Sequence, residues 1–279
     1  MGINRYTGRV FLREIVLVIV AVIWWIPFYF LVSTSLKSLD ETFSSPTALP
    51  KDPTLSNFSE AWRGTAVGTL GDALQSSFII TVGSVLLLIL FGSLGAYAIA
   101  RRVGQLSTIL YFLFVLGIIL PFQLGLVPAY VAMRHLHLTG SYLGLILLYT
   151  GLLLPLTIFL YTGFIRVMPK EYEEAAQVDG AGLVRTFLRV VFPLLRPITG
   201  TVAILTGLIV WNDFFIPLVF LSGTPKQTLP VAVYSFVGEH LSVWGIVFAA
   251  VGISVAPLLA FFVIAQRQLI RGFTGGIKT

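Results

Sequence analysis

The sequence predicts an all-α membrane protein with six transmembrane helices and with both ends of the chain on the cytoplasmic side. Hydrophobic residues make up 57% of the chain and charged residues only 11%. A soluble domain carries about 25% charged residues, so lipid rather than water must cover much of this protein. Six stretches have the length and apolarity of a membrane-crossing helix. They are residues 15–36, 77–100, 106–133, 142–165, 197–221 and 244–265.

Lys and Arg are distributed unequally between the two sides that these spans define. The side that holds both chain ends carries 13 of the 18 basic residues, and the other side carries 5. The 13 are Arg5, Arg9, Arg13, Arg101, Arg102, Arg166, Lys170, Arg185, Arg189, Arg196, Arg267, Arg271 and Lys278. Because cytoplasmic loops are enriched in Lys and Arg, this side is predicted to be the cytoplasm. The first apolar stretch is longer than the core of a signal peptide, so we expect a retained helix.

The spans divide the chain into a short cytoplasmic segment, residues 1–14, and one transmembrane domain, residues 15–279. The outer loop at 37–76 is rich in Pro, Ser, Thr and Asp and is long enough to pack as a small cap or to meet an external partner. A second long loop, residues 166–196, lies on the cytoplasmic side. The residues from 266 onward are expected to form a cytoplasmic tail.

The cytoplasmic loop reads RVMPKEYEEAAQVDGAGLVRTFLRVVFPLLR, which predicts a helix, a turn and a second helix. Pro169 lies where a helix would begin, and carboxylates in the first turns favour the positive end of the helix dipole. These carboxylates belong to Glu171, Glu173 and Glu174. Asp179 and Gly180 supply the stop, since Gly readily adopts a left-handed conformation. The second helix is predicted to run over 183–192 and to end at Pro193.

A small-residue patch edged by carboxylates suits insertion into a groove on another protein. The alternative, an amphipathic helix lying on the bilayer, is disfavoured because the acidic start would meet anionic lipid. The segment Glu174-Ala175-Ala176, three residues, Gly180, nine residues, Val190-Val191-Phe192-Pro193 resembles the EAA motif of ABC importer permeases. It departs from the pattern EAA-x3-G-x9-I-x-L-P only by Val190 and Phe192, both apolar.

In that family the loop is a coupling helix between the fourth and fifth transmembrane helices, and it docks into a cleft on a separate ATPase. The resemblance therefore assigns the ATPase contact to Glu174, Ala175, Ala176 and Gly180, with Asp179 shaping or joining it. It also implies a second, homologous permease subunit, two copies of the ATPase and an extracytoplasmic solute-binding protein. Whether the two permeases are identical stays open, and a non-identical pair is expected.

Further segments resemble the carbohydrate branch of these permeases, in particular the smaller maltose-type subunit. They are LVSTSLK, LPFQLGLVPAYVAMRHLHLTGSYLGLILLY, WNDFFIPLVFL and the C-terminal QRQLIRGFTGGIKT. The resemblance implies a sugar or sugar-like solute. In the maltose-type subunit the tail reaches the ATPase interface, a role that would fall here on Gly275, Gly276 and Lys278.

The fifth span contains the candidate residues for the solute pathway. Thr199, Thr206 and Asp213 are spaced by seven, so a continuous helix would place them near one face. A carboxylate at membrane depth is costly, so Asp213 should face protein or water. Aromatic rings can stack on a sugar, and Asn212 and Asp213 can bond its hydroxyls. The rings are Trp211, Phe214 and Phe215, and Gln123 beside Pro121 is a further candidate. Helix packing and a structural hydrogen-bonded pair explain the same residues equally well.

Several function classes are excluded or disfavoured. The chain has no Cys and no G-x-x-x-x-G-K-[ST] motif, so thiol chemistry is excluded and any ATP and Mg²⁺ belong to a partner. His135, His137 and His240 lie in or near outer loops and predict no metal site. The scattered basic residues do not form a nucleic-acid surface. A stand-alone secondary transporter or channel would leave the cytoplasmic loop unexplained, and an intramembrane enzyme would need a catalytic pair that the sequence lacks.

Overall fold

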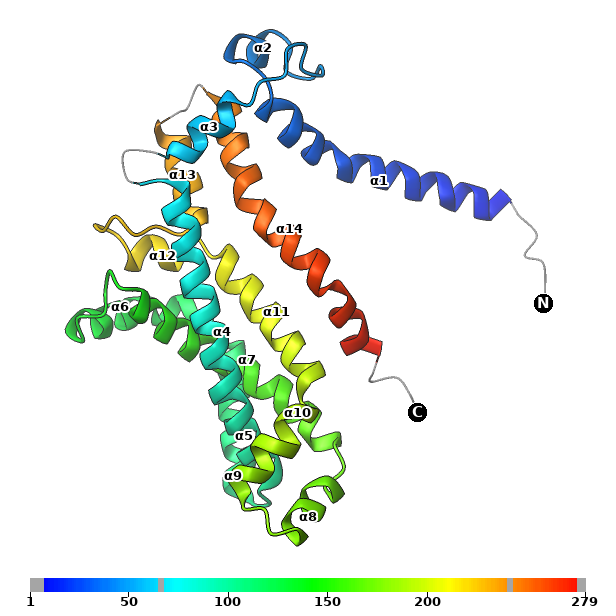
Figure 1. The fold of residues 1–279 in the computed structure, drawn as a ribbon, viewed down its shortest axis with the longest axis vertical. Helices are drawn as coiled ribbons and strands as arrows, with labels where there is room; N and C mark the ends of the chain where they lie inside the picture. Colours follow the sequence, from blue (N-terminus) through cyan, green and yellow to red (C-terminus); the bar gives the residue numbers. More distant parts are fainter. Residues whose placement is uncertain (1–7, 65–67, 240–242, 275–279) are drawn as a thin grey trace. The chain divides into compact units, whose positions relative to one another are not determined.

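The structure is a computed structural model that describes residues 8–64, 68–239 and 243–274, which fold mainly into helices (Figure 1). The elements are α1 (Gly8–Ser35), α2 (Leu39–Ser44), α3 (Ser56–Arg63), α4 (Leu70–Arg101), α5 (Gln105–Ile119), the 3₁₀ helix η1 (Phe122–Gly125), α6 (Leu126–His135), α7 (Tyr142–Val167), α8 (Glu171–Val178), α9 (Leu183–Thr186), the π-helical turn η2 (Phe187–Val191), α10 (Phe192–Leu194), α11 (Arg196–Asn212), α12 (Phe215–Phe220), α13 (Leu229–Glu239) and α14 (Trp244–Thr274). They belong to two compact units, Met1–Leu70 with Ala232–Pro257 and Gly71–Val231 with Leu258–Thr279.

Three helices of the described residues are long and apolar enough to cross a membrane: Val10–Ser35, Leu70–Arg101 and Tyr142–Val167. Two bent pairs raise this number to five if each pair is one span. The pairs are Gln105–Ile119 with Phe122–His135 and Leu183–Leu194 with Arg196–Asn212. The prediction of an all-α membrane protein is thereby confirmed, with three to five candidate spans among the described residues.

In the first unit, the segment between α1 and α3 packs through buried polar groups. The Nζ of Lys37, which is only 1% exposed, donates to the carbonyls of Ser45 and Pro46. The amide of Asn57 in α3 donates to the carbonyls of Ser35 and Lys37, which ties α3 to the end of α1. Buried polar groups are stable only when bonded, and these contacts satisfy that requirement. The expected outer loop therefore contains two short helices, α2 and α3.

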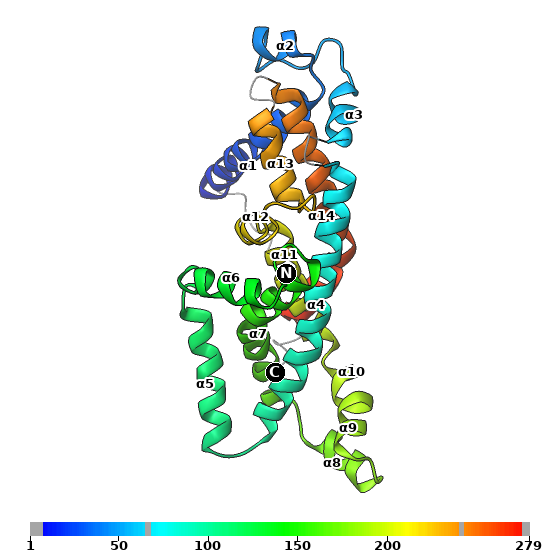
Figure 2. The ribbon, with the colours of Figure 1, turned by 90° about the vertical axis from the view of Figure 1, so that its left-hand side faces the viewer.

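The second unit contains two hydrophobic clusters. One joins α4, α7, α11 and α12 and consists of Ile80, Leu145, Leu148, Tyr149, Val210, Ile216, Phe220 and Leu221. The other joins α4, α7, α11 and the turn η2 and consists of Ala96, Tyr161, Ile165, Phe187, Val191, Leu195 and Val202. Figures 1 and 2 show α8 beyond the C-terminal ends of α4 and α7. The second cluster includes Phe187 and Val191 of η2, the turn that α8 contacts. This cluster therefore packs next to α8.

Glycine allows α4 and α7 to approach closely. A Cβ placed on Gly92 would collide with the side chain of Thr157, and one on Gly83 would collide with Ile146. Small residues at such contacts are typical of membrane helices, whose association depends on close packing rather than on the hydrophobic effect.

The stretch 106–133 was expected to be one span, and the structure shows that it is not one continuous helix. The helix α5 ends at Ile119, and η1 with α6 turns away by 94° (Figure 2). Leu120 is extended (ψ 127°) because the ring of Pro121 disfavours the helical conformation in the preceding residue. Proline also lacks the N–H that would continue the helix. Pro121 therefore marks a break rather than an ordinary kink.

The stretch 197–221 is also not one continuous helix. Helix α11 ends at Asn212, Asp213 is extended (ψ 126°), and α12 begins at Phe215. The expected shared face of Thr199, Thr206 and Asp213 is thus wrong for Asp213, which lies beyond the helix. The second helix of the cytoplasmic loop was predicted to end at Pro193, but it continues through Leu194 and then bends by 74° into α11. The wide turn η2 precedes Pro193 and accommodates it within this helix.

Candidate functional site

Helix α8 forms where the sequence predicts it and ends with a specific capping geometry. Glu171, Glu173 and Glu174 occupy its first turn, where the helix dipole stabilises negative charge. At the other end, Gly180 has φ 81°. The N–H of Gly180 donates to the carbonyl of Gln177, and the N–H of Ala181 donates to that of Ala176. This pair of bonds is a Schellman motif, which fixes the direction in which the chain leaves the helix.

The residues assigned to the ATPase contact are brought together on an accessible part of this loop. Glu174, Ala175, Asp179 and Gly180 are exposed, and Ala176 is half-buried. Large apolar side chains adjoin them with most of their surface free. They are Tyr172, Val178, Leu183 and Val184, with Val178 87% exposed. Within this chain, α8 and the start of α9 therefore present an apolar surface edged by carboxylates.

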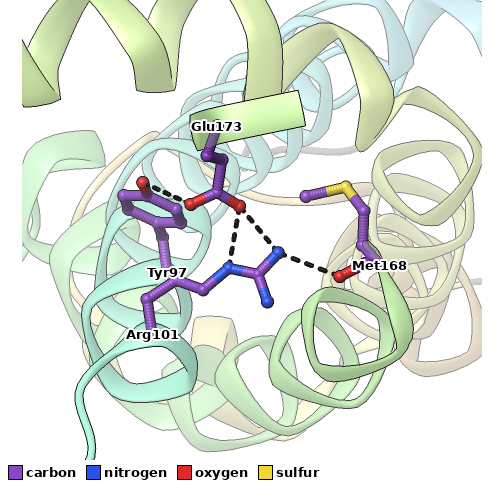
Figure 3. Close-up of polar contacts among 4 residues, drawn as sticks. All are labelled: Tyr97, Arg101, Met168 and Glu173. Atoms are coloured by element: carbon purple, nitrogen blue, oxygen red, sulfur yellow. Dashed lines mark hydrogen bonds and ion pairs between the residues drawn. The ribbon is translucent and has the colours of Figure 1, made fainter. Parts of the chain in front are cut away.

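Glu173 lies on the opposite side of α8 and is only 6% exposed (Figure 3). Its Oε1 accepts from Nε of Arg101 at 2.8 Å and lies 2.6 Å from Nη2 of the same residue. Its Oε2 accepts from the hydroxyl of Tyr97 at 2.9 Å. The same Nη2 of Arg101 donates to the carbonyl of Met168 at 3.1 Å. The carboxylate thus joins α8 to the last turn of α4.

The role of Glu173 was not predicted, although its charge was noted as favourable at the helix start. The sequence contained a signal, since Arg101 ends an apolar span and an acidic cluster lies on the same predicted side. Three carboxylates of the same helical turn were candidates, however, and only the three-dimensional packing selects Glu173. Tyr97 was missed because an aromatic residue in a span gives no sign of a hydrogen-bond partner 76 residues away.

A cavity of about 530 Å³ lies in the second unit between the bend after α5 and the break after α11. Gln123, Asn212 and Asp213, all predicted pathway residues, are among the residues that line it, together with Tyr149. The remaining lining residues include Leu120, Phe122, Leu152, Leu153, Leu156, Ile209 and Ile216. Trp211, Phe214 and Phe215 flank the break but do not line this cavity. A mainly apolar wall with a few polar groups is typical of small-molecule sites.

Asp213 uses both carboxylate oxygens to hold the break. Its Oδ2 accepts a hydrogen bond from the hydroxyl of Tyr149 at 2.8 Å, and its Oδ1 accepts from the N–H groups of Phe215 at 2.9 Å and Ile216 at 3.4 Å. Asp213 therefore caps the start of α12, as Asp commonly does at a helix N-terminus. Asn212 donates to the carbonyl of Leu208 in its own helix and also lines the cavity.

The described residues contain no group of three or more metal-ligating side chains. Gly275, Gly276 and Lys278 of the tail, and also His240, lie outside the described residues.

Comparison with known proteins identifies the family. Residues 89–275 match the model of the family described as "Binding-protein-dependent transport system inner membrane component". The chain is 40% identical over 92% of both chains to the melibiose/raffinose/stachyose import permease protein MelC of Bacillus subtilis. It is 34% identical to the multiple sugar-binding transport system permease protein MsmG of Streptococcus mutans, over 95% of this chain and 96% of that one.

The fold is shared with a solved structure described as a bacterial ABC transporter involved in the import of the acidic polysaccharide alginate. The TM-score is 0.82 at 21% identity, with 96% of this chain and 99% of that chain covered. Together with the apolar helices described above, these findings make the chain a multi-pass inner-membrane transport subunit. The chain belongs to the family of inner-membrane permease components of binding-protein-dependent transport systems.

Proposed function

We propose that this chain is one of two membrane-spanning subunits of an ATP-driven importer for a sugar or sugar-like solute. The family membership supports transport that depends on a binding protein. The sugar class is supported by the relatives, whose names specify melibiose, raffinose and stachyose import, starch degradation products and multiple sugars. The ATP would be hydrolysed, with Mg²⁺, by two copies of a separate cytoplasmic subunit.

The observation that carries this proposal is the two-sided arrangement of α8. Its free side exposes Glu174, Ala175 and Gly180, while Glu173 ties its other side to the chain. A short helix that is anchored on one side and free on the other suits a docking element that passes on movement. The proposed docking site on the ATPase consists of Glu174, Ala175, Ala176, Asp179 and Gly180.

The proposed topology has six spans, corresponding to α1, α4, α5 with α6, α7, α11 with α12, and α14. Both ends and the coupling loop, residues 166–196, would lie in the cytoplasm, because 13 of the 18 basic residues would then be cytoplasmic. A six-span subunit supplies half of a pathway, so a second permease subunit is required. The C-terminal tail resembles that of the smaller maltose-type subunit, and by this resemblance Gly275, Gly276 and Lys278 would reach the ATPase pair.

The proposed mechanism needs no covalent chemistry in this chain. Closure of the ATPase pair on ATP would move the docked α8, and rigid-body rotation of the spans would change the side from which the solute pathway is open. Gln123 and Asn212 are the best-placed groups to bond solute hydroxyls, because they line the cavity. Asp213 would hold the pathway in shape. Trp211, Phe214 and Phe215 would contact solute where the route passes the break.

Reconstitution into liposomes tests this function. The purified chain would be inserted alone, or with its partner permease, ATPase and binding protein, and uptake of labelled oligosaccharide would be measured with and without internal ATP. We expect uptake only with all partners and ATP. Flux through vesicles that contain this chain alone would instead favour a stand-alone transporter or channel.

A further inference from the structure

Two side chains connect α8 to a span that is distant in the sequence. Helix α8 follows α7 after only a short linker, and α9, η2 and α10 lead from it into α11, so the backbone itself ties α8 to these two helices. Helix α4 has no such tie, since Arg101 lies 72 residues before Glu173. The direct side-chain contacts between α8 and α4 that the structure describes are those of Glu173 with Arg101 and Tyr97, in addition to the packing of α4 against α7 and α11.

The contacts of Glu173 with Arg101 and Tyr97 restrict the movement of α8 relative to the end of α4. Both oxygens of Glu173 are engaged, and Arg101 presents two nitrogens to one of them. The side chains of Arg101 and Glu173 are 12% and 8% exposed, so water screens their attraction weakly. A guanidinium that donates from two nitrogens also fixes direction, which a single point charge does not.

Tyr97 of α4 contacts both α8 and the π-helical turn η2. Its hydroxyl donates to Glu173, while its ring lies 5.2 Å from the ring of Phe187 in η2. Phe187 in turn lies 6.0 Å from Phe192. One residue of α4 therefore contacts both α8 and the helix that follows it, so that α8, η2 and the end of α4 form one packed block.

We propose that Glu173 and Arg101 are positioning residues that make α4 follow the movement of α8. This proposal rests on the proposed function and goes beyond it, because it assigns the transfer of movement to an internal ion pair rather than to the ATPase contact. Loss of the pair should leave the free side of α8 able to bind the ATPase. Loss of the ion pair should instead uncouple ATP hydrolysis from solute transport.

The first test uses charge-neutral variants of the full chain in the reconstituted complex. Glu173→Gln and Arg101→Gln keep the approximate shape of each side chain and remove the attraction. We expect the ATPase to remain bound and the ratio of solute transported to ATP hydrolysed to fall by about tenfold, within the range of coupling between sites. The matched controls are Glu171→Gln in the same helix turn and Arg102→Gln beside Arg101, both exposed, which should keep the wild-type ratio.

The second test replaces the ion pair by a reversible covalent link. The chain contains no Cys, so Arg101→Cys with Glu173→Cys introduces a unique thiol pair, to be combined with Cys-free partners. A short bifunctional methanethiosulfonate should restore the ratio in the double variant, and a reducing agent should remove the gain.

The outcomes separate the two proposals. If the wild-type chain binds no ATPase, the proposed function fails. If the ATPase binds but Glu173→Gln keeps the wild-type ratio, or if the covalent link restores nothing, only the positioning role is overturned.

Discussion

The hydroxyl of Tyr149 in α7 donates a 2.8 Å hydrogen bond to Oδ2 of Asp213, at the point where α11 gives way to α12. Tyr149 is 1% exposed, so the bond starts from the core of the second unit. It connects residues 64 positions apart and holds a broken helix against a continuous one. The break and the cavity beside it therefore depend on a side-chain contact as well as on backbone geometry.

This contact predicts a graded loss of stability. Asp213→Ala removes the cap of α12, worth about 1 kcal/mol. It also leaves the Tyr149 hydroxyl without its acceptor, at a cost of about 1–3 kcal/mol. Tyr149→Phe removes only one hydrogen bond and should cost about 0.5–1.5 kcal/mol. Thermal unfolding of the purified variants in detergent measures both, and equal midpoints for Asp213→Ala and wild type would show that the bond does not hold the break.

The polar groups at the cavity wall should affect solute handling rather than stability. Gln123→Ala and Asn212→Ala should each raise the solute concentration for half-maximal uptake by about two- to tenfold, the equivalent of one hydrogen bond. The unfolding midpoint should remain close to that of the wild type. Uptake assays over a range of oligosaccharide concentrations provide the measurement. Unchanged uptake in both variants would place the pathway elsewhere.

The conformation of Gly180 predicts a difference between two neighbouring glycines. A Cβ on Gly180 or on Gly182 would meet no other atom within 4 Å, so neither substitution creates a steric clash. Gly180 has φ 81°, a region that costs an L-residue about 1–2 kcal/mol, whereas Gly182 has φ −69°. Gly180→Ala should therefore loosen the end of α8 and speed hydrogen exchange there, and Gly182→Ala should not. Equal exchange rates would contradict this role of the turn.

The contact between α4 and α7 predicts a second contrast. Gly92→Ala places a methyl group against Thr157, whereas Gly163→Ala in α7 meets no atom within 4 Å. The first variant should lower the unfolding midpoint. The second should be neutral or slightly stabilising, because Ala favours a helix over Gly by about 1 kcal/mol. A midpoint for Gly92→Ala at or above that of Gly163→Ala would show that the helices can separate without cost.

Local features of the chain were predictable, and long-range ones were not. The Glu-rich start, the two alanines and Asp179-Gly180 predicted α8 almost to its ends, because capping and propensity act within a few residues. Pro121 was visible in the sequence, but a proline in a span is compatible with both a kink and a break. The break at Asp213 could not be predicted, because its stabilising partner Tyr149 is brought near only by the fold. The choice of Glu173 among three carboxylates likewise depends on where α4 ends.

In the proposed importer, the free side of α8 lies in the cytoplasm and docks on a separate ATPase. Site-directed crosslinking tests it directly, because Ala175→Cys gives the Cys-free chain one thiol on exposed α8. The matched control is Ser56→Cys at the exposed start of α3, on the proposed outer side. We predict that Ala175→Cys crosslinks to the ATPase and is protected from a membrane-impermeant maleimide in spheroplasts, whereas Ser56→Cys is labelled there and captures no ATPase. Labelling of Ala175→Cys from outside, or no crosslink to an ATPase that supports uptake, would contradict a cytoplasmic, ATPase-docked α8.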